Sequence, residues 1–162
     1  MMNESSLTDL FNSAVAAFPR TRMRQHATDP IRIVEMRWTP FLGVRTLFVK
    51  ARAQNEGREY SPIILFKNVL YGQPGVRLRV EGQEVTFAPL SNEETQVMLR
   101  CDCADFRWRF NYYDHVDRSL FGRVRSPYES QGGPPANPRE LPGMCKHLMK
   151  MWYAIRDAHL FS

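Results

Sequence analysis

The first apolar positions of the chain repeat with the spacing of a helix. Five of them lie on a common helical face: Leu7, Leu10, Phe11, Ala14 and Val15. This pattern predicts an amphipathic helix over residues 6–18, because such positions share one stripe of a 3.6-residue repeat. Ser6, with Asp9 three residues later, resembles a capping box, and Pro19 ends the segment. We expect the helix to dock against the core.

Between residues 31 and 89 the pattern changes to the two-residue alternation of strands. Three stretches are rich in β-formers: IRIVEMRW, TLFVKAR and EYSPIILFKNVLY. In a fourth, GVRLRVEGQEVTFAPL, the apolar residues alternate with arginines and Glu81-Gly82 supplies a turn, which predicts a hairpin. The apolar residues are Val76, Leu78 and Val80, and the arginines are Arg77 and Arg79. Strands at such short spacing predict one antiparallel meander or curled sheet.

A further strand pair is predicted where TQVMLRC is followed by FRWRFNYY. In the second stretch, Phe106, Trp108 and Phe110 alternate with Arg107 and Arg109. Residues 114–142 are rich in proline and glycine and predict a loop or arm; loops of this length tend to be functional or disordered. After them, CKHLMKMWYAIRDAHL predicts a helix with four apolar residues on one face: Leu148, Met149, Trp152 and Ile155.

The composition is that of a globular protein, with 43% hydrophobic and 24% charged residues. The longest uncharged apolar run is far shorter than the ~20 residues of a membrane span. The beginning of the sequence, MMNESSLTDLF, lacks the basic start and apolar core of a signal peptide. We therefore expect a soluble protein that stays in a reducing compartment, the cytoplasm, without a membrane partner.

The net charge of +5 is unevenly distributed. Residues 19–52 contain eight Lys or Arg residues and two acids. Such a block is typical of a surface for nucleic acid or another polyanion. It is equally typical of a solvated face of a sheet, and the charge alone does not decide between the two.

The three cysteines form a pattern with a histidine. Cys101 and Cys103 make C-x-C, and Cys145 and His147 make C-x-H. Three thiolates and one imidazole suit a closed tetrahedral Zn²⁺ site. Residues i and i+2 of a strand point to the same side, so Cys101 and Cys103 can face one ion from a strand. In a helix they point apart, which predicts Cys145 just before the C-terminal helix and His147 in its first turn.

Other roles for these residues explain less of the pattern. Three cysteines cannot all pair within one chain, and a reducing compartment disfavours disulfides. A catalytic Cys–His pair leaves the C-x-C unexplained, and four protein ligands leave no open position on the metal for water. The remaining histidines (His26, His115 and His159) and the acids Asp114 and Asp117 are not expected to bind metal. We expect no enzymatic activity and no small-molecule substrate.

The pattern CDCADF…GMCKHL resembles the SWIM-type zinc-binding domain. In that family C-x-C and C-x-H form a ββα finger that is implicated in DNA binding and in protein–protein contacts. The resemblance covers roughly residues 97–158 and implies one structural zinc ion on the four residues named above. The 41-residue spacer, residues 104–144, is longer than the usual range of the family. It indicates a built-out arm in addition to the finger.

Together with DFRWRFNYYDHVDRSLFGR and PPANPRELPGMCKHL, the motif also resembles a group of tailed-bacteriophage proteins with unassigned or virion-structural roles. These observations predict an α+β fold in two parts. Residues 1–96 form an N-terminal helix and antiparallel sheet. Residues 97–162 form a ββα zinc module with a C-terminal helix and an arm inserted at about residues 111–142.

The arm contains arginines interleaved with apolar and aromatic residues, a mixture common in protein interfaces and in phosphate contacts combined with base stacking. The candidate partner-binding residues are Arg107, Arg109, Arg118, Phe121, Arg123, Arg125 and Tyr128. We expect a non-enzymatic adaptor that contacts other proteins, such as the subunits of a phage particle, in which it would be incorporated. The alternative is a nucleic-acid-binding zinc-finger module.

Overall fold

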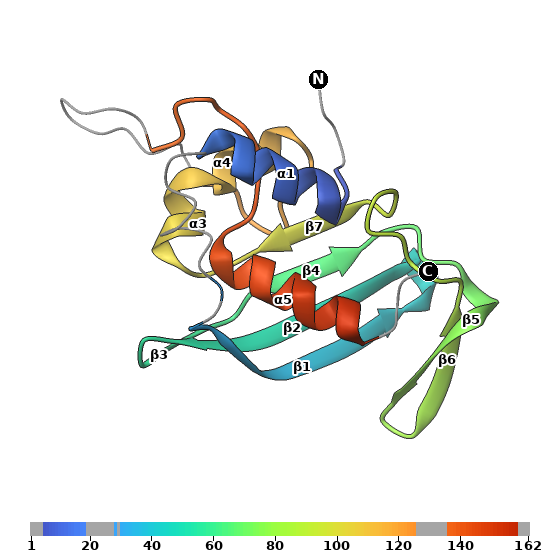
Figure 1. Cartoon of the computed structure of the whole chain (residues 1–162). Coiled ribbons are helices and arrows are strands. Elements are labelled where there is room, and N and C mark those ends of the chain that lie inside the picture. Colours follow the sequence, from blue (N-terminus) through green and yellow to red (C-terminus); the bar gives the residue numbers. More distant parts are fainter. Residues whose placement is uncertain (1–4, 19–27, 29, 126–135, 159–162) are drawn as a thin grey trace.

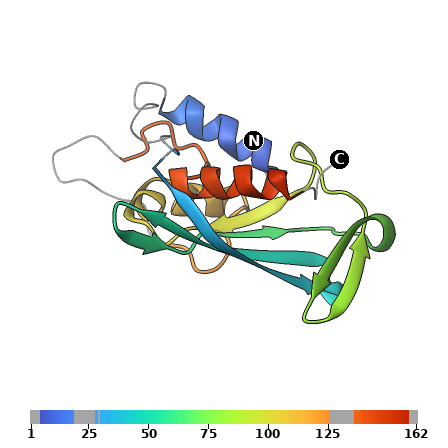
Figure 2. The ribbon, with the colours of Figure 1, turned by 60° about the horizontal axis from the view of Figure 1, so that its bottom comes forward.

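The computed structural model has two layers, with two helices packed on one face of an antiparallel sheet (Figures 1 and 2). It describes residues 5–18, 28, 30–125 and 136–158. The helices are α1 (Leu7–Ala17) and α5 (Lys146–Asp157), which come from opposite ends of the chain. The fold is α+β, as predicted. Pro19, His26, Tyr128 and His159, which are named above, lie outside the described ranges, as do three arginines of the basic block: Arg20, Arg22 and Arg24.

Helix α1 begins as the sequence predicts. The Ser6 hydroxyl accepts a hydrogen bond from the backbone N–H of Asp9 at 3.2 Å, and the Asp9 carboxylate accepts one from the Ser6 N–H at 3.1 Å. This reciprocal pair satisfies two N–H groups that have no partner within the helix. In the part of the chain described, no helix is both long and apolar enough to cross a membrane.

The main sheet has five antiparallel strands. They are β1 (Arg32–Phe41), β2 (Thr46–Asn55), β3 (Arg58–Tyr60), β4 (Ile63–Phe66) and β7 (Val97–Arg100). The order is β1-β2-β4-β7, with β3 paired to β2. A one-turn 3-10 helix, η2 (Leu42–Val44), connects β1 to β2. The first four strands of this sheet, β1 to β4, are consecutive in the sequence, and β7 joins them after a segment that leaves the sheet.

That segment contains the predicted hairpin. Strands β5 (Tyr71–Val80) and β6 (Gln83–Phe87) form a separate two-stranded sheet beyond one end of the main sheet (Figure 2). Glu81 and Gly82 at the turn have φ of 50° and 78°. Two positive φ values are the signature of a two-residue turn whose twist matches that of the flanking strands. The prediction of one continuous meander was wrong, because β5 and β6 leave the main sheet.

One hydrophobic core lies between the sheet and the helices. It contains alternate residues of β2 together with apolar residues of α1 and α5, such as Leu47, Val49, Leu10, Leu148 and Met149, all of which have 0% exposure. The predicted apolar face of the C-terminal helix is confirmed. Strand β7 lies after the predicted division at residues 96 and 97, yet it belongs to the same sheet as β1, β2 and β4.

Residues 104–116 form two short helices, so the predicted strand over FRWRFNYY was wrong. They are α3 (Ala104–Arg109) and α4 (Asn111–Val116). The alternating aromatic residues concealed a second spacing, because Phe106 and Phe110 are four residues apart and both are buried. Asp105 and Arg109, also four apart, form an ion pair at 2.9 Å. Contacts at i and i+4 favour a helix over a strand.

Several described residues at the two ends of the predicted arm (about residues 111–142) are packed into the fold, while residues 126–135 of the arm lie outside the described ranges. The side chain of Asn111 accepts a hydrogen bond from the Arg125 N–H at 2.7 Å. The Asn137 amide donates to the carbonyl oxygens of Arg109 and Leu141, both at 2.8 Å. Both asparagines are 2% exposed. Buried amides with satisfied hydrogen bonds fix these segments against α3 and α4.

Candidate metal centre

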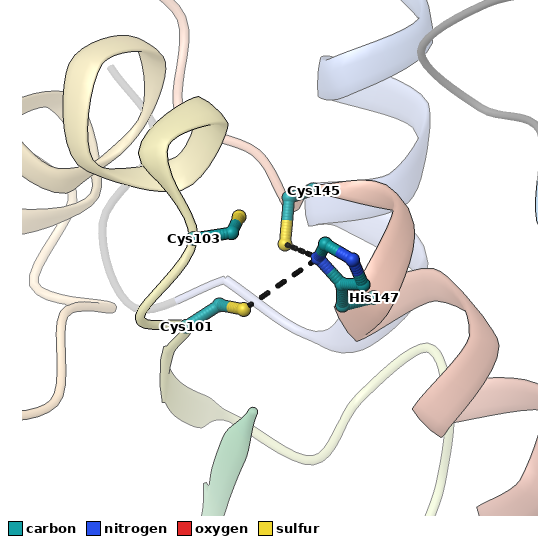
Figure 3. Close-up of side chains that lie close together, drawn as sticks. All are labelled: Cys101, Cys103, Cys145 and His147. Carbon is teal, nitrogen blue, oxygen red and sulfur yellow. Dashed lines mark hydrogen bonds between the residues drawn. The ribbon is translucent and has the colours of Figure 1, made fainter. Parts of the chain in front are cut away.

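Four side chains from two distant segments converge in the interior. The side chains of Cys101 and Cys103 meet those of Cys145 and His147 (Figure 3), and their ligand atoms all lie within 4.8 Å of one another. None of the four is more than 4% exposed. The prediction that these residues lie together is confirmed, and the group can hold a metal ion.

Each ligand lies at the end of an element. Cys101 follows β7, and Cys103 caps the start of α3, where its sulfur accepts a hydrogen bond from the Phe106 N–H at 3.3 Å. Cys145 precedes α5 and His147 is in the first turn of that helix, as predicted. The prediction that Cys101 and Cys103 share a strand was wrong. The chain turns between them from strand to helix and still directs both sulfurs inward.

Two of the separations are close to those of a tetrahedral zinc site. Zn–S and Zn–N bonds of about 2.3 and 2.0 Å place sulfurs about 3.8 Å apart and sulfur and nitrogen about 3.5 Å apart. The Nδ1 atom of His147 is 3.9 Å from Cys101 Sγ and 3.9 Å from Cys145 Sγ. Shifts of a few tenths of an ångström bring this nitrogen and these two sulfurs to the separation expected of zinc ligands, and all four ligand atoms lie within 4.8 Å of one another. The donor set is soft and excludes water by burial, which favours zinc over magnesium or calcium.

Two further residues fix the histidine ring. The Asn55 amide lies 3.2 Å from His147 Nε2 and is 7% exposed, and the Tyr60 ring lies 4.2 Å from the imidazole, centroid to centroid. Because Nε2 faces this amide, Nδ1 is the nitrogen that faces the sulfurs. The atom of Asn55 that faces Nε2 is the amide nitrogen, which is a donor. A histidine that binds metal through Nδ1 carries its proton on Nε2, so the Asn55 amide would turn to present its oxygen as the acceptor and in this way hold the tautomer and the ring.

The electrostatics of the group call for a cation. Burial raises the pKa of the Cys101 and Cys145 thiols well above the ordinary value, while hydrogen bonding with Cys101 and then Cys145 lowers the pKa of Cys103. One thiolate is thus compatible with the site, and three are not, because like charges in a low-dielectric interior repel strongly. A divalent cation at the centre would compensate the charge and allow all three sulfurs to bind it.

The segment before Cys145 is held by a buried carboxyl group. Asp114 Oδ1 accepts a hydrogen bond from the Gly143 N–H at 2.7 Å, and Asp114 is fully buried. A Cβ atom on Gly143 would lie 2.6 Å from Phe110 Cε1 and 2.8 Å from Ala14 Cβ. Only glycine allows this close approach, so the segment before α5 is packed between α1 and the end of α3.

The candidate partner-binding residues are distributed over several contacts. Arg107 is exposed beside Trp108, whereas Arg109 stacks on the Phe18 ring at 4.5 Å and pairs with Asp105. Phe121 is half-buried against Phe48 at 5.5 Å. Arg118, Arg123 and Arg125 are exposed. Their role in binding a partner stays a prediction.

Asn55 and Tyr60 were not predicted as neighbours of the site, because more than half the length of the chain separates them from His147. Asp114 and Asp117 were not expected to bind metal, and no structural role was predicted for them. Both are buried, with Asp114 turned to Gly143 and Asp117 accepting from the Ser5 N–H at 3.4 Å, while His115 is exposed. In a stretch rich in proline and glycine, an acidic residue that is buried and accepts backbone hydrogen bonds looks the same in the sequence as one in an exposed loop.

No protein-family model, curated protein or solved structure matches the chain. The resemblances seen in the motifs therefore have no support from a family match.

Proposed function

We propose that this protein is a non-enzymatic adaptor whose fold is closed by one structural zinc ion and whose surface contacts other proteins. The observation that supports it is the closed, buried set of three cysteines and one histidine, which joins the β7–α3 turn to the start of α5. Cys101, Cys103, Cys145 and His147 would hold the metal. Four protein ligands fill a tetrahedral shell, which is typical of structural rather than catalytic zinc.

The two halves of the site are separated by 41 residues. Bringing them together costs loop-closure entropy, which grows slowly with length. Metal binding contributes on the order of 10 kcal/mol in small zinc modules, so it exceeds this cost. The ion would link the end of the sheet to the helix that covers the core.

The test is native mass spectrometry and elemental analysis of protein purified without added metal. We expect one zinc per chain in the wild type and none in Cys145→Ser. The His147→Cys variant is the matched control, because it replaces one zinc ligand by another and should retain the ion. A wild-type protein that is folded and free of metal would overturn the zinc assignment.

The nucleic-acid alternative is supported by the net charge of +5. Part of the basic block is neutralised within the molecule, since Glu35 pairs with Arg37 at 2.8 Å and with Arg52 at 3.0 Å. Fluorescence anisotropy with duplex and single-stranded DNA across a salt series separates the two functions. Phosphate binding should weaken steeply with salt. Tight, salt-dependent binding that is lost in Cys145→Ser would favour the alternative.

A place in a phage particle is the most specific form of the proposal, and it depends on the motif resemblance alone. It predicts that the protein is found by mass spectrometry in purified particles, or in assembly intermediates if it acts before completion. If the protein is absent from both, it does not act in a phage particle or in its assembly.

A further inference from the structure

Helices α1 and α5 cover one face of the main sheet and leave the other face without a helix (Figure 2). Residues that lie directly opposite each other in antiparallel strands point to the same face. On the covered face such partners are fully buried, for example Val49 and Ile64. Their neighbours along each strand point the other way and are half-buried or exposed. We call this second surface, made of alternate residues of β1, β2, β4 and β7, the uncovered face.

A row of cations crosses the uncovered face. Arg37 on β1 lies opposite Lys50 on β2. On β4, Ile63 lies opposite both Lys50 and Arg100, which is on β7. Neighbouring strands are about 4.8 Å apart, so one line of side chains across four strands contains three basic residues. We call Arg37, Lys50 and Arg100 the cation row.

The β7 end of the cation row is extended by further arginines. The Arg100 guanidinium donates to the carbonyl oxygens of Phe121 and Arg123 at 3.2 and 2.8 Å, which fixes its position without compensating its charge. Burial lowers the pKa of Arg100, and the charge of the exposed Arg125 lowers it further, so these two cations are close. The next acid, Asp102, accepts a backbone hydrogen bond at 2.8 Å from the segment before β4. Fixed guanidinium groups without a carboxylate partner are suited to phosphate.

The acids on the uncovered face compensate only part of its charge. Glu35 pairs with Arg37 at 2.8 Å and with Arg52 at 3.0 Å. Glu59 pairs with Arg52 at 2.9 Å. Within the described part of the chain, Lys50 is exposed and is in no ion pair with an acid. The uncovered face therefore has an excess of positive charge from Lys50 to the β7 end.

Three phenylalanines lie beside the cation row. Phe41 and Phe48 are diagonal neighbours on β1 and β2, because Phe41 lies opposite Thr46. The Phe121 ring lies 5.5 Å from the Phe48 ring, centroid to centroid. Phe41 is 47% exposed, and the other two are half-buried. Phe48 and Lys50 are two residues apart on one strand, so about 7 Å separates these rings from the cations. We call the three rings the phenylalanine stripe.

We propose that the uncovered face binds single-stranded nucleic acid, with phosphates on the cation row and bases against the phenylalanine stripe. An acidic peptide would satisfy the cations alone, whereas a nucleotide strand joins each phosphate through one sugar to one planar base. Base stacking on aromatic side chains along a basic surface is the common mode of single-strand binding. A duplex keeps its base faces within its own stack, so it can use only the cations. The inference goes beyond the proposed adaptor function and does not depend on it.

The test is fluorescence anisotropy of the zinc-loaded full chain with labelled twelve-nucleotide oligo(dT), oligo(U) and a duplex of the same length. We expect a single strand to bind about tenfold or more tightly than the duplex, because only its bases can stack. Lys50→Glu should lower the affinity for that strand about tenfold and reduce the salt dependence by about one phosphate contact. Arg77→Glu is the matched control. It makes the same change of charge on the separate β5–β6 sheet and should change the affinity less than about twofold.

Phe41→Leu separates base stacking from apolar contact. Leucine keeps an apolar side chain at this exposed position and removes the ring, so the affinity should fall about fivefold or more. Photo-cross-linking with an oligomer that contains 5-iodouracil locates the strand, and we expect cross-links in peptides that contain Phe41, Phe48 or Phe121. The proposal is overturned if the duplex binds as tightly as the single strands, if Lys50→Glu binds like Arg77→Glu, if Phe41→Leu binds like the wild type, or if the cross-links lie elsewhere.

These outcomes are distinct from a failure of the proposed function. If zinc binds one to one and no oligonucleotide binds, the metal centre stands and this inference falls. If a single strand binds the uncovered face and the protein contains no zinc, the inference stands and the zinc assignment falls. Binding that is lost in Cys145→Ser and unchanged in Lys50→Glu would place the nucleic acid on the zinc module and would also overturn the inference.

Discussion

The two outer strands of the main sheet, β7 and β1, differ in what contacts their outer backbone groups. At β7, Ser119 and Phe121 pair with the strand, and the guanidinium of Arg100 donates to the Phe121 and Arg123 carbonyl oxygens at 3.2 and 2.8 Å. Cys101 and Cys103 follow directly. At β1 the outer backbone groups face a groove and exposed apolar residues.

The long connections of the chain stabilise the β7 side of the sheet. The segment after α4 returns to cover β7, and the segment before α5 is held by Asp114 and Asn137. The open side, at β1, needs no such support, since β1, β2 and the β5–β6 hairpin are made by local turns. We therefore expect substitutions near β7 to change stability and substitutions near β1 to change binding.

The largest effect is expected from loss of a metal ligand. Cys145→Ser should lower the free energy of unfolding by several kcal/mol, because metal binding is coupled to folding in such sites. Hydrogen exchange should rise across residues 97–158, most of all in α3 and at the start of α5, while β1 and β2 retain protection. Unchanged exchange in that segment would contradict the account.

A smaller loss is expected from Gly143→Ala. The added methyl group would lie 2.6 Å from Phe110 Cε1, and overpacking of this kind costs roughly 1–3 kcal/mol. Urea unfolding measures the change. Gly43→Ala in η2 is the control, because a Cβ there meets nothing within 4 Å. Equal stability of the two variants would show that the approach to Cys145 is not tightly packed.

Loss of the Asn55 side chain, which contacts His147, should lower the affinity for zinc more than the stability of the fold. We expect Asn55→Ala to weaken zinc binding by about 10- to 100-fold, as loss of an outer partner of a metal-binding histidine does. Competition with a chromophoric chelator gives the affinity. A variant that binds zinc as tightly as the wild type would mean that Tyr60 and the α5 backbone alone orient the ring.

Asp114 should give stability a pH dependence. Burial raises its pKa, and the Asp117 carboxylate raises it further, although the Gly143 N–H acts in the opposite direction. The folded state therefore retains a proton that the unfolded chain has released, and stability falls as pH rises from the ordinary carboxyl pKa through the raised one.

Asp114→Asn removes this proton equilibrium and should flatten that part of the profile. Urea unfolding of both proteins between about pH 4 and about pH 8 measures it, and the thiol contributions cancel in the difference. A difference that stays constant over this range would contradict a raised pKa for Asp114.

The smallest effect on stability is expected at the open side. Phe41→Ser with Leu42→Ser should change the free energy of unfolding by less than about 0.5 kcal/mol per site, since both side chains are about half exposed or more. Thermal unfolding measures this. A loss comparable to that of Gly143→Ala would mean that these two side chains belong to the core.

Local patterns predicted much of this fold. The α1 capping box, the hairpin at Glu81-Gly82, the strands between residues 31 and 89 and the buried face of α5 follow from spacing within a few residues. Residues 104–116 show the limit of that approach. Phe106 and Phe110 fit both the two-residue alternation of a strand and the i, i+4 spacing of a helix. The hydrogen bond from the Phe106 N–H to the Cys103 sulfur and the burial of both rings in the core favour the helix.

The metal ligands were predictable because their side-chain chemistry is restrictive, whereas their supports were not. Asparagine and aspartate are common in surface turns, so Asn55, Asn137 and Asp114 do not stand out in the sequence. Their roles depend on contacts with residues far along the chain, such as the hydrogen bond from the Gly143 N–H to Asp114. For the same reason the sequence did not reveal that β1 would be left at an open edge.

The most direct test of the central claim is X-ray absorption spectroscopy at the zinc edge of the purified protein. We predict three sulfur ligands at about 2.3 Å and one nitrogen at about 2.0 Å. In His147→Cys the fit should change to four sulfurs. Fewer than three sulfurs in the wild type, or an oxygen ligand from water, would contradict a closed site formed by Cys101, Cys103, Cys145 and His147.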